Sequence, residues 1–189
     1  MSTEPAGHRY DIDILRAIAI GSIVLFHVWP DALPGGFLGV DVFFVISGFI
    51  ITRNERERFL SGRFSFVAFY KRRAKRILPS LLVTIAVTLV AALAVFEVDF
   101  HKPLLWSAFA ASFAFSNITF WTEAGYFDAA AILKPLLHTW SLGLEEQFYL
   151  VWPLALVLLL PRSRTMAFVV LGGLAFASLA AAEPPRHTR

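Results

Sequence analysis

The chain has 189 residues, of which 57% are hydrophobic and only 16% are charged. Soluble domains carry more charge than this, so the composition indicates a membrane protein. The net charge of +3 is too small to indicate nucleic acid as a partner. The chain contains no cysteine, which excludes disulfides, thiolate metal ligands and a cysteine nucleophile.

The first two apolar stretches cover residues 14–29 and 37–52, with the turn PDALPGG between them. Acidic residues precede the first stretch where a signal peptide has basic ones, so we interpret it as a retained helix. Segment 53–76 then holds nine of the 17 basic residues. By the positive-inside rule this segment is a cytoplasmic loop, which predicts a cytoplasmic N-terminus.

Four further apolar stretches follow, at residues 77–96, 104–121, 136–160 and 166–182. We therefore predict an all-α, polytopic transmembrane helical bundle of about five to six hydrophobic segments. Stretch 104–121 is interrupted by serines and an asparagine, and either crosses the membrane or forms a re-entrant hairpin. Re-entry is favoured because it keeps the basic PRSR segment at 161–164 on the cytoplasmic side. Residues 1–182 are assigned to one membrane domain and residues 183–189 to a tail.

Arg16 and His27 are the two basic side chains within the first predicted helix. They are 11 residues apart, which places them on one helix face, about 16 Å apart along the axis. Ionisable residues inside a span usually face a partner, a cavity or a substrate path. Arg16 alternatively snorkels or pairs with Asp13, whereas His27 is a candidate proton acceptor.

The second stretch adds Asp41 and Ser47. In an antiparallel hairpin, Asp41 is expected to return to roughly the depth of His27 and to form a His–carboxylate pair that orients the imidazole. Ser47 lies in FFVISGF, where it either takes part in chemistry or lets two helices approach closely.

The sequence YKRRAKRILP places Arg73 and Arg76 at the i, i+3 spacing, which gives a cationic edge at the membrane surface. One interpretation is an anchor for anionic lipid head groups. The other is recognition of donor phosphates, to which arginine is better suited than lysine. A CoA thioester fits this second role, since the chain has no Walker A or dinucleotide-binding motif.

In LLHTWSLGLEEQFYLVWP, the residues His138, Ser141 and Glu145 follow i, i+3, i+7 spacing and share a face if helical. They could bind a sugar hydroxyl or relay protons. A metal site is not predicted, because the chain lacks a zinc-type histidine spacing. We interpret the nearby aromatic residues Trp140, Tyr149 and Trp152 as an interfacial belt.

Taken together, several segments resemble the membrane-bound acyltransferase family 3, the O-acetyltransferases of lipopolysaccharide O-antigens, peptidoglycan, exopolysaccharides and macrolides. The matching segments are YDIDILRAIAIGSIVLFHVWP, GGFLGVDVFFVISGFIIT, FYKRRAKRILPSL, SNITFW with GYFD, and PLLHTWSLGLEEQFYLVWP. The resemblance implies transfer of an acyl group, commonly acetyl from acetyl-CoA, to a carbohydrate hydroxyl at the outer face of the bacterial inner membrane. It implies no bound cofactor.

The resemblance also implies roles for individual residues. His27 matches the essential catalytic histidine and acts as general base or transient acyl carrier, with Arg16 as its companion. Arg73 and Arg76 match the donor-side R-x-x-R. The remaining matches, whose roles the resemblance defines less closely, are Asp41, Ser47, His138, Ser141 and Glu145.

The chain resembles only the N-terminal half of such a domain, so we expect it to need missing C-terminal helices or a complementary half. Two alternatives remain open. One is a non-catalytic truncated remnant, and the other is a proton or ion transport module that uses Arg16, His27 and Glu145.

Overall fold

The structure is a computed structural model that describes residues 9–124 and 133–182. Within these residues it is built from α-helices and short 3-10 turns, which confirms the predicted all-α class. The elements are α1 (Tyr10–Val28), η1 (Gly36–Leu38), α2 (Gly39–Leu60), α3 (Phe66–Val95), η2 (Val98–Phe100), α4 (His101–Ser112), α5 (Ser116–Glu123), α6 (Thr139–Leu159) and α7 (Arg164–Ala182).

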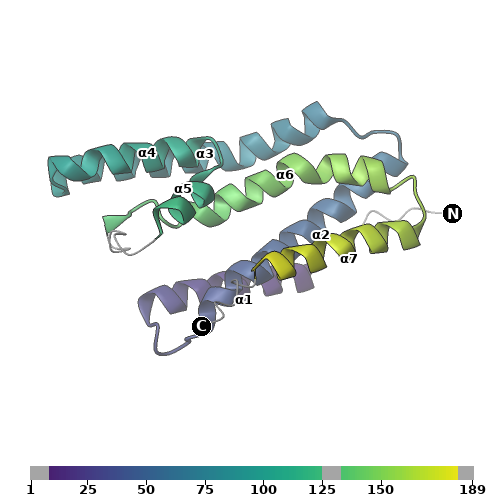
Figure 1. Cartoon of the computed structure of the whole chain (residues 1–189), viewed down its shortest axis with the longest axis horizontal. Helices are drawn as coiled ribbons and strands as arrows, with labels where there is room; N and C mark the ends of the chain where they lie inside the picture. Colours follow the sequence, from purple (N-terminus) through teal and green to yellow (C-terminus); the bar gives the residue numbers. More distant parts are fainter. Residues whose placement is uncertain (1–8, 125–132, 183–189) are drawn as a thin grey trace, which may run out of the picture.

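The long helices lie roughly along one direction, and α2 runs obliquely between two groups of them (Figure 1). At its beginning α2 packs antiparallel to α1, and further along it contacts α6. Helix α3 packs against α4, and α5 packs against α6. Helix α2 therefore connects the part of the bundle that holds His27 with the part that holds the arginines of α3.

Two glycines allow α1 and α2 to approach closely. A Cβ atom on Gly36 would lie 2.4 Å from the carbonyl oxygen of Ser22, and one on Gly39 would lie 2.4 Å from that of Ala19. Backbone contact of this kind is characteristic of small residues at helix interfaces in membranes. Gly36 and Gly39 thus determine how α2 returns along α1.

The basic segment 53–76 is helical rather than a loop, which corrects the sequence interpretation. Helix α2 continues to Leu60, and only residues 61–65 form the connection to α3. Gly62 adopts a positive φ of 68° in this turn, and the Ser65 side chain accepts a hydrogen bond from the backbone N–H of Ala68 to cap α3. Apart from Arg63, which lies in the connection, these basic residues therefore lie on the ends of two long helices.

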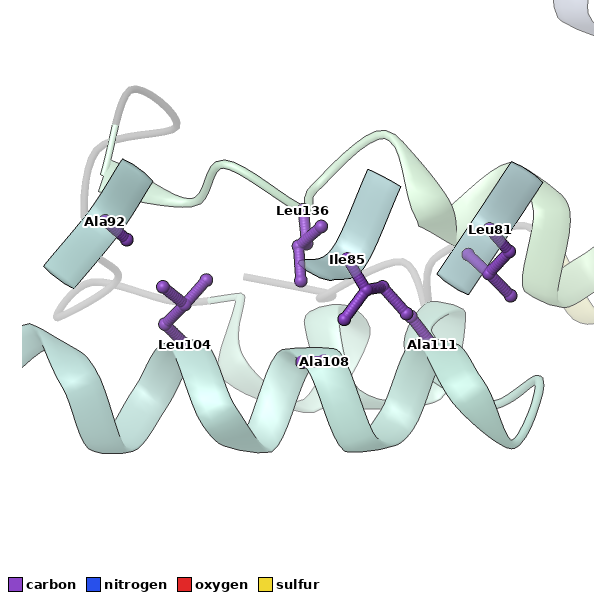
Figure 2. Packing of buried hydrophobic residues seen from close by; sticks show 7 residues of the cluster. All are labelled: Leu81, Ile85, Ala92, Leu104, Ala108, Ala111 and Leu136. Atoms are coloured by element: carbon purple, nitrogen blue, oxygen red, sulfur yellow. The ribbon is translucent and has the colours of Figure 1, made fainter. Parts of the chain in front are cut away.

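Stretch 104–121 is divided between α4 and α5, with Ala114 between them at a φ of 62°. At 12 and 8 residues these helices extend about 18 Å and 12 Å, too short to cross a hydrocarbon core of about 30 Å. This division is consistent with the predicted re-entrant hairpin. Helix α4 is held on α3 by an apolar cluster of side chains from both helices, joined by Leu136 from the segment before α6 (Figure 2).

Polar contacts attach α5 to α6. The buried Ser116 hydroxyl donates to the Thr139 carbonyl at 2.7 Å. The Gln147 amide donates to the Ala114 carbonyl and to Asn117 Oδ1, both at 2.8 Å, and accepts from Asn117 Nδ2 at 3.1 Å. The strained Ala114 turn is thus held by a side chain of α6, which gives SNITFW and LEEQ a shared structural role.

Much of the apolar surface faces outward. The accessible surface is 13960 Å², against roughly 9,000 Å² for a soluble monomer of this mass. Within the described part of the chain, three helical segments are long and apolar enough to cross a membrane, namely Gly36–Leu60, Phe66–Val95 and Thr139–Leu159. Helix α1 carries Asp11, Asp13 and Arg16, and the apolar part of α7 covers only Thr165–Ala181. The exposed apolar side chains are those expected of an all-α membrane protein.

Gly143 provides a test of the α5–α6 attachment. A Cβ atom there would lie 3.0 Å from Ser116 Oγ and 3.1 Å from Asn117 Oδ1. We expect Gly143→Val to push α5 away and to cost about 1–3 kcal/mol in the free energy of unfolding. Thermal unfolding in detergent micelles measures this, with Gly172→Val, which meets no atom within 4 Å, as the matched control. Equal melting temperatures for the two variants would contradict the attachment.

Candidate functional site

His27 lies in the last turn of α1, and the structure defines its tautomer. Its Nδ1 atom is 2.8 Å from the carbonyl oxygen of Ile23. A carbonyl oxygen only accepts hydrogen bonds, so Nδ1 carries the hydrogen in the neutral ring and Nε2 carries the lone pair. Because the side chain is exposed, Nε2 is available as a proton acceptor or nucleophile.

The predicted pair of His27 with Asp41 is not formed among the described residues. The rings of Phe26 and Phe37 are 5.7 Å apart, so His27 lies near the level of Phe37. Gly39 and Phe43 both face α1. Asp41 is two residues from each, which rotates it about 200° to the other side of α2. The Ile23 carbonyl, and not Asp41, orients the imidazole.

Arg16 is half-buried between α1 and α2. Its guanidinium carbon lies 5.5 Å from the centre of the Phe43 ring, a cation–π contact. Phe43 of α2 follows Phe37 of η1 by six residues and precedes Ser47 by four. Arg16 therefore lies between the level of His27 and the level of the side chains around Ser47.

Ser47, Arg73, Glu145 and Tyr149 come together from three helices. The Tyr149 hydroxyl donates to Glu145 Oε1, and the Ser47 side chain lies near the same phenol. The Arg73 guanidinium carbon lies 4.9 Å from the centre of the Tyr149 ring and 5.5 Å from that of Phe69. Three of the predicted site residues are thus assembled around one tyrosine.

Aromatic contacts leave the hydrogen-bonding capacity of Arg73 largely unused. They involve the flat faces of the guanidinium, whereas its five N–H groups project from the edge. Arg73 lines a cavity of about 210 Å³ with Tyr70, Ala74, Glu146 and Tyr149 among its walls. The cavity therefore has a positioned cation on one wall and a carboxylate on another.

The neighbouring Arg72 is used differently. Its Nη2 atom lies 3.1 Å and 3.2 Å from the two carboxylate oxygens of Glu55, which is only 3% exposed. Arg58 approaches the same carboxylate at 3.9 Å. The pair joins α2 to α3, so Arg72 has a structural role while Arg73 and the exposed Arg76 remain available.

His138 and Ser141 do not join this cluster. His138 is exposed immediately before α6, and the Ser141 hydroxyl donates to the His138 carbonyl at 3.2 Å. Tyr149 is 11 residues further along α6, a distance of about 16 Å. Of the three residues predicted to share one helix face, only Glu145 reaches Arg73 and Tyr149.

The two parts of the candidate site are separated along α2. His27 lies near the level of Phe37, and the tyrosine-centred cluster begins at Ser47, ten residues further. At the rise of a helix this corresponds to about 15 Å. A substrate that contacts both parts has to be long.

Sequence reasoning missed Tyr149, Glu146 and the Glu55–Arg72 pair. The i, i+4 spacing of Glu145 and Tyr149 was a usable signal, but the tyrosine was interpreted as part of an aromatic belt. Glu55 lies among arginines, and only the packing of α2 on α3 reveals which of them it neutralises. The segment GYFD at 125–128 and the predicted tail at 183–189 lie outside the described residues.

An acyltransferase-domain family model matches residues 9–183. The O-acetyltransferase OatA of Staphylococcus aureus is 42% identical over 153 residues, which cover 80% of this chain and 25% of that protein. The peptidoglycan O-acetyltransferase OatA of Listeria monocytogenes is 37% identical over 155 residues, 79% of this chain and 24% of that protein. BcsY of Komagataeibacter xylinus is 42% identical over 165 residues, 86% of this chain and 41% of that protein.

The chain spans about a quarter to two fifths of the length of these curated relatives. No solved structure matches it.

The Glu55–Arg72 pair provides a test of the cluster's support. We expect Arg72→Met to cost about 3 kcal/mol in the free energy of unfolding, because it leaves a buried carboxylate with only the more distant Arg58. Glu55→Gln should cost less, because the Arg72 guanidinium that loses its partner is half-exposed. A double-mutant cycle on thermal unfolding in micelles, completed with Glu55→Gln plus Arg72→Met, measures the coupling. Strictly additive effects would show that the pair does not hold α3 on α2.

Proposed function

Because the chain belongs to the acyltransferase family whose model it matches, we propose that it takes part in transferring an acyl group, in the first place acetyl from acetyl-CoA, to a hydroxyl of a cell-envelope or secreted carbohydrate. Membership confirms the family resemblance predicted from sequence. The names of the OatA relatives support O-acetylation, and that of the Listeria protein supports peptidoglycan as the class of acceptor. The observation that carries the proposal is the orientation of His27, whose Nε2 is left free to accept a proton.

In the proposed reaction, His27 Nε2 removes the proton from an acceptor hydroxyl as its oxygen attacks the thioester carbonyl. The new C–O bond forms and the C–S bond breaks. The imidazolium then returns the proton to the departing thiolate, which leaves as a free thiol. The Ile23 carbonyl holds the Nδ1–H throughout, so the ring keeps its orientation as it gains and loses the proton.

The donor is proposed to bind through Arg73 and Arg76. Arg73 is held by the aromatic rings of Phe69 and Tyr149 before any ligand arrives, so little side-chain entropy remains to be lost on binding a phosphate. Its planar edge suits bidentate contacts with phosphate oxygens. Tyr149 is in turn fixed by Glu145, which assigns Glu145 a positioning role behind Arg73.

This arrangement accounts for the separation of about 15 Å between the arginines and His27. A CoA thioester carries its acyl group at the end of a long pantetheine arm, far from its phosphates. With the phosphates at Arg73 and the arm extended along α2, the thioester would pass Arg16 and approach His27. In the proposed orientation the N-terminus and the α2–α3 turn are cytoplasmic, so the donor binds from the inside of the bacterial inner membrane and the acyl group travels outward.

Two pairs of basic residues on one helix end give a matched test of donor binding. We expect Arg73→Ala plus Arg76→Ala to weaken CoA binding at least tenfold, because both proposed phosphate contacts are lost. Lys71→Ala plus Lys75→Ala removes the same charge from the same end of α3 and should change affinity less than threefold. Isothermal titration of the chain in nanodiscs with CoA measures both. Equal losses would indicate general electrostatic attraction and would overturn the assignment.

His27 has its own test. We expect His27→Asn to lower acetyl transfer about 100-fold or more, because it removes the general base, while membrane insertion stays unchanged. The measurement is incorporation of labelled acetate into envelope carbohydrate by cells that carry the variant. Retained activity would exclude His27 as the base. A proton-transport module would instead show proton flux into proteoliposomes that is lost in the same variant without any acyl transfer.

A further inference from the structure

A second cavity lies further along α6 than the cavity that Arg73 lines. Helices α6 and α7 are joined at one end by a short turn, and α2 lies beside them (Figure 1). The three helices enclose a crevice of about 650 Å³. None of its lining residues belongs to the donor cavity or to the surroundings of His27.

The walls of this crevice are apolar. They are formed by side chains of the last turns of α6 and the first turns of α7, among them Leu156, Leu159 and Phe168. Its two uncharged polar side chains satisfy each other, since Trp152 Nε1 donates to Thr52 Oγ1 at 2.8 Å. Thr52 itself donates to the Gly48 carbonyl at 2.6 Å. The interior therefore suits a hydrocarbon chain rather than a polar group.

Two arginines, Arg56 of α2 and Arg162 of the α6–α7 turn, also line the crevice. Arg53 pairs with Glu57, and Arg58 and Arg72 pair with Glu55. The ion pairs found among the described residues include neither Arg56 nor Arg162. Arg162 donates to the Leu158 carbonyl in the last turn of α6, which places its guanidinium at the end of that helix. The lining residues include no acidic side chain.

We propose that this crevice binds one anionic phospholipid of the cytoplasmic leaflet, with its phosphate between Arg56 and Arg162 and an acyl chain against Leu156, Leu159 and Phe168. The argument is charge complementarity at the membrane surface. Guanidinium groups bind phosphate strongly, and the apolar walls match the chain attached to it. The site does not depend on acyl transfer, because it shares no residue with the catalytic or donor machinery.

The test is native mass spectrometry of the purified chain, titrated with phosphatidylglycerol or phosphatidylcholine of identical acyl chains. We expect the wild-type chain to prefer phosphatidylglycerol about tenfold, and Arg56→Gln plus Arg162→Gln to abolish the preference. The matched control, Arg53→Gln plus Arg63→Gln, removes equal charge from the same end of the bundle and should keep the preference within twofold. A wild-type chain without preference, or an equal loss in both double variants, would overturn the proposal.

A second variant tests the walls without altering charge. Ala167 lines the crevice, and Ala167→Trp should fill it and lower the affinity for both lipids at least fivefold. If lipid binding is unchanged in this variant, the lipid binds elsewhere and the proposal fails. The same spectra report the oligomeric state. If the wild-type chain is a dimer, Ala167→Trp makes it a monomer and lipid binding persists, then a second copy of the chain occupies the crevice and the proposal fails.

Discussion

The ion pair between Glu55 and Arg72 is the constraint on which the arrangement of α2 and α3 depends. A carboxylate that is only 3% exposed requires a partner, and Arg72 supplies a guanidinium to both of its oxygens. The pairing fixes the rotation of α3 on α2. Because Arg73 is the next residue, the same rotation directs it toward α6, where its guanidinium packs on the Tyr149 ring. This buried ion pair thus gives Arg72 a structural role and leaves Arg73 available to a ligand.

The arginines at this end of the bundle illustrate how neighbouring cations acquire different roles. Arg72 uses its N–H groups on a carboxylate, whereas Arg73 uses its faces on aromatic rings and keeps its N–H groups. Arg56 and Arg162 line an apolar crevice instead. A count of positive charge predicts a cytoplasmic surface and anionic ligands, but the partners of each side chain decide which arginine meets which ligand.

Sequence patterns predicted the helical class and the interrupted stretch 104–121, because apolar periodicity and polar interruptions are local properties. The family resemblance rested instead on the order of specific motif segments. The patterns also identified Ser47, Arg73 and Glu145, which the structure brings together. They did not predict that segment 53–76 is helical, since positive charge specifies a side of the membrane rather than a backbone conformation. The expected Asp41–His27 pair depended on helix rotation, which Gly36 and Gly39 set through contacts that a hairpin argument does not include.

The rotation of α2 relative to α1 also affects how a bundle of this kind could carry an acyl group outward. Successive turns of one face of α2 present Gly39, Phe43 and Ser47, and these contact or approach α1, Arg16 and Tyr149 in that order. The candidate catalytic and donor residues therefore lie beside a single helical stripe, although they come from different helices. Since the stripe begins level with His27 and ends at the arginine cluster, an extended donor aligned with α2 would span both without any helix having to move.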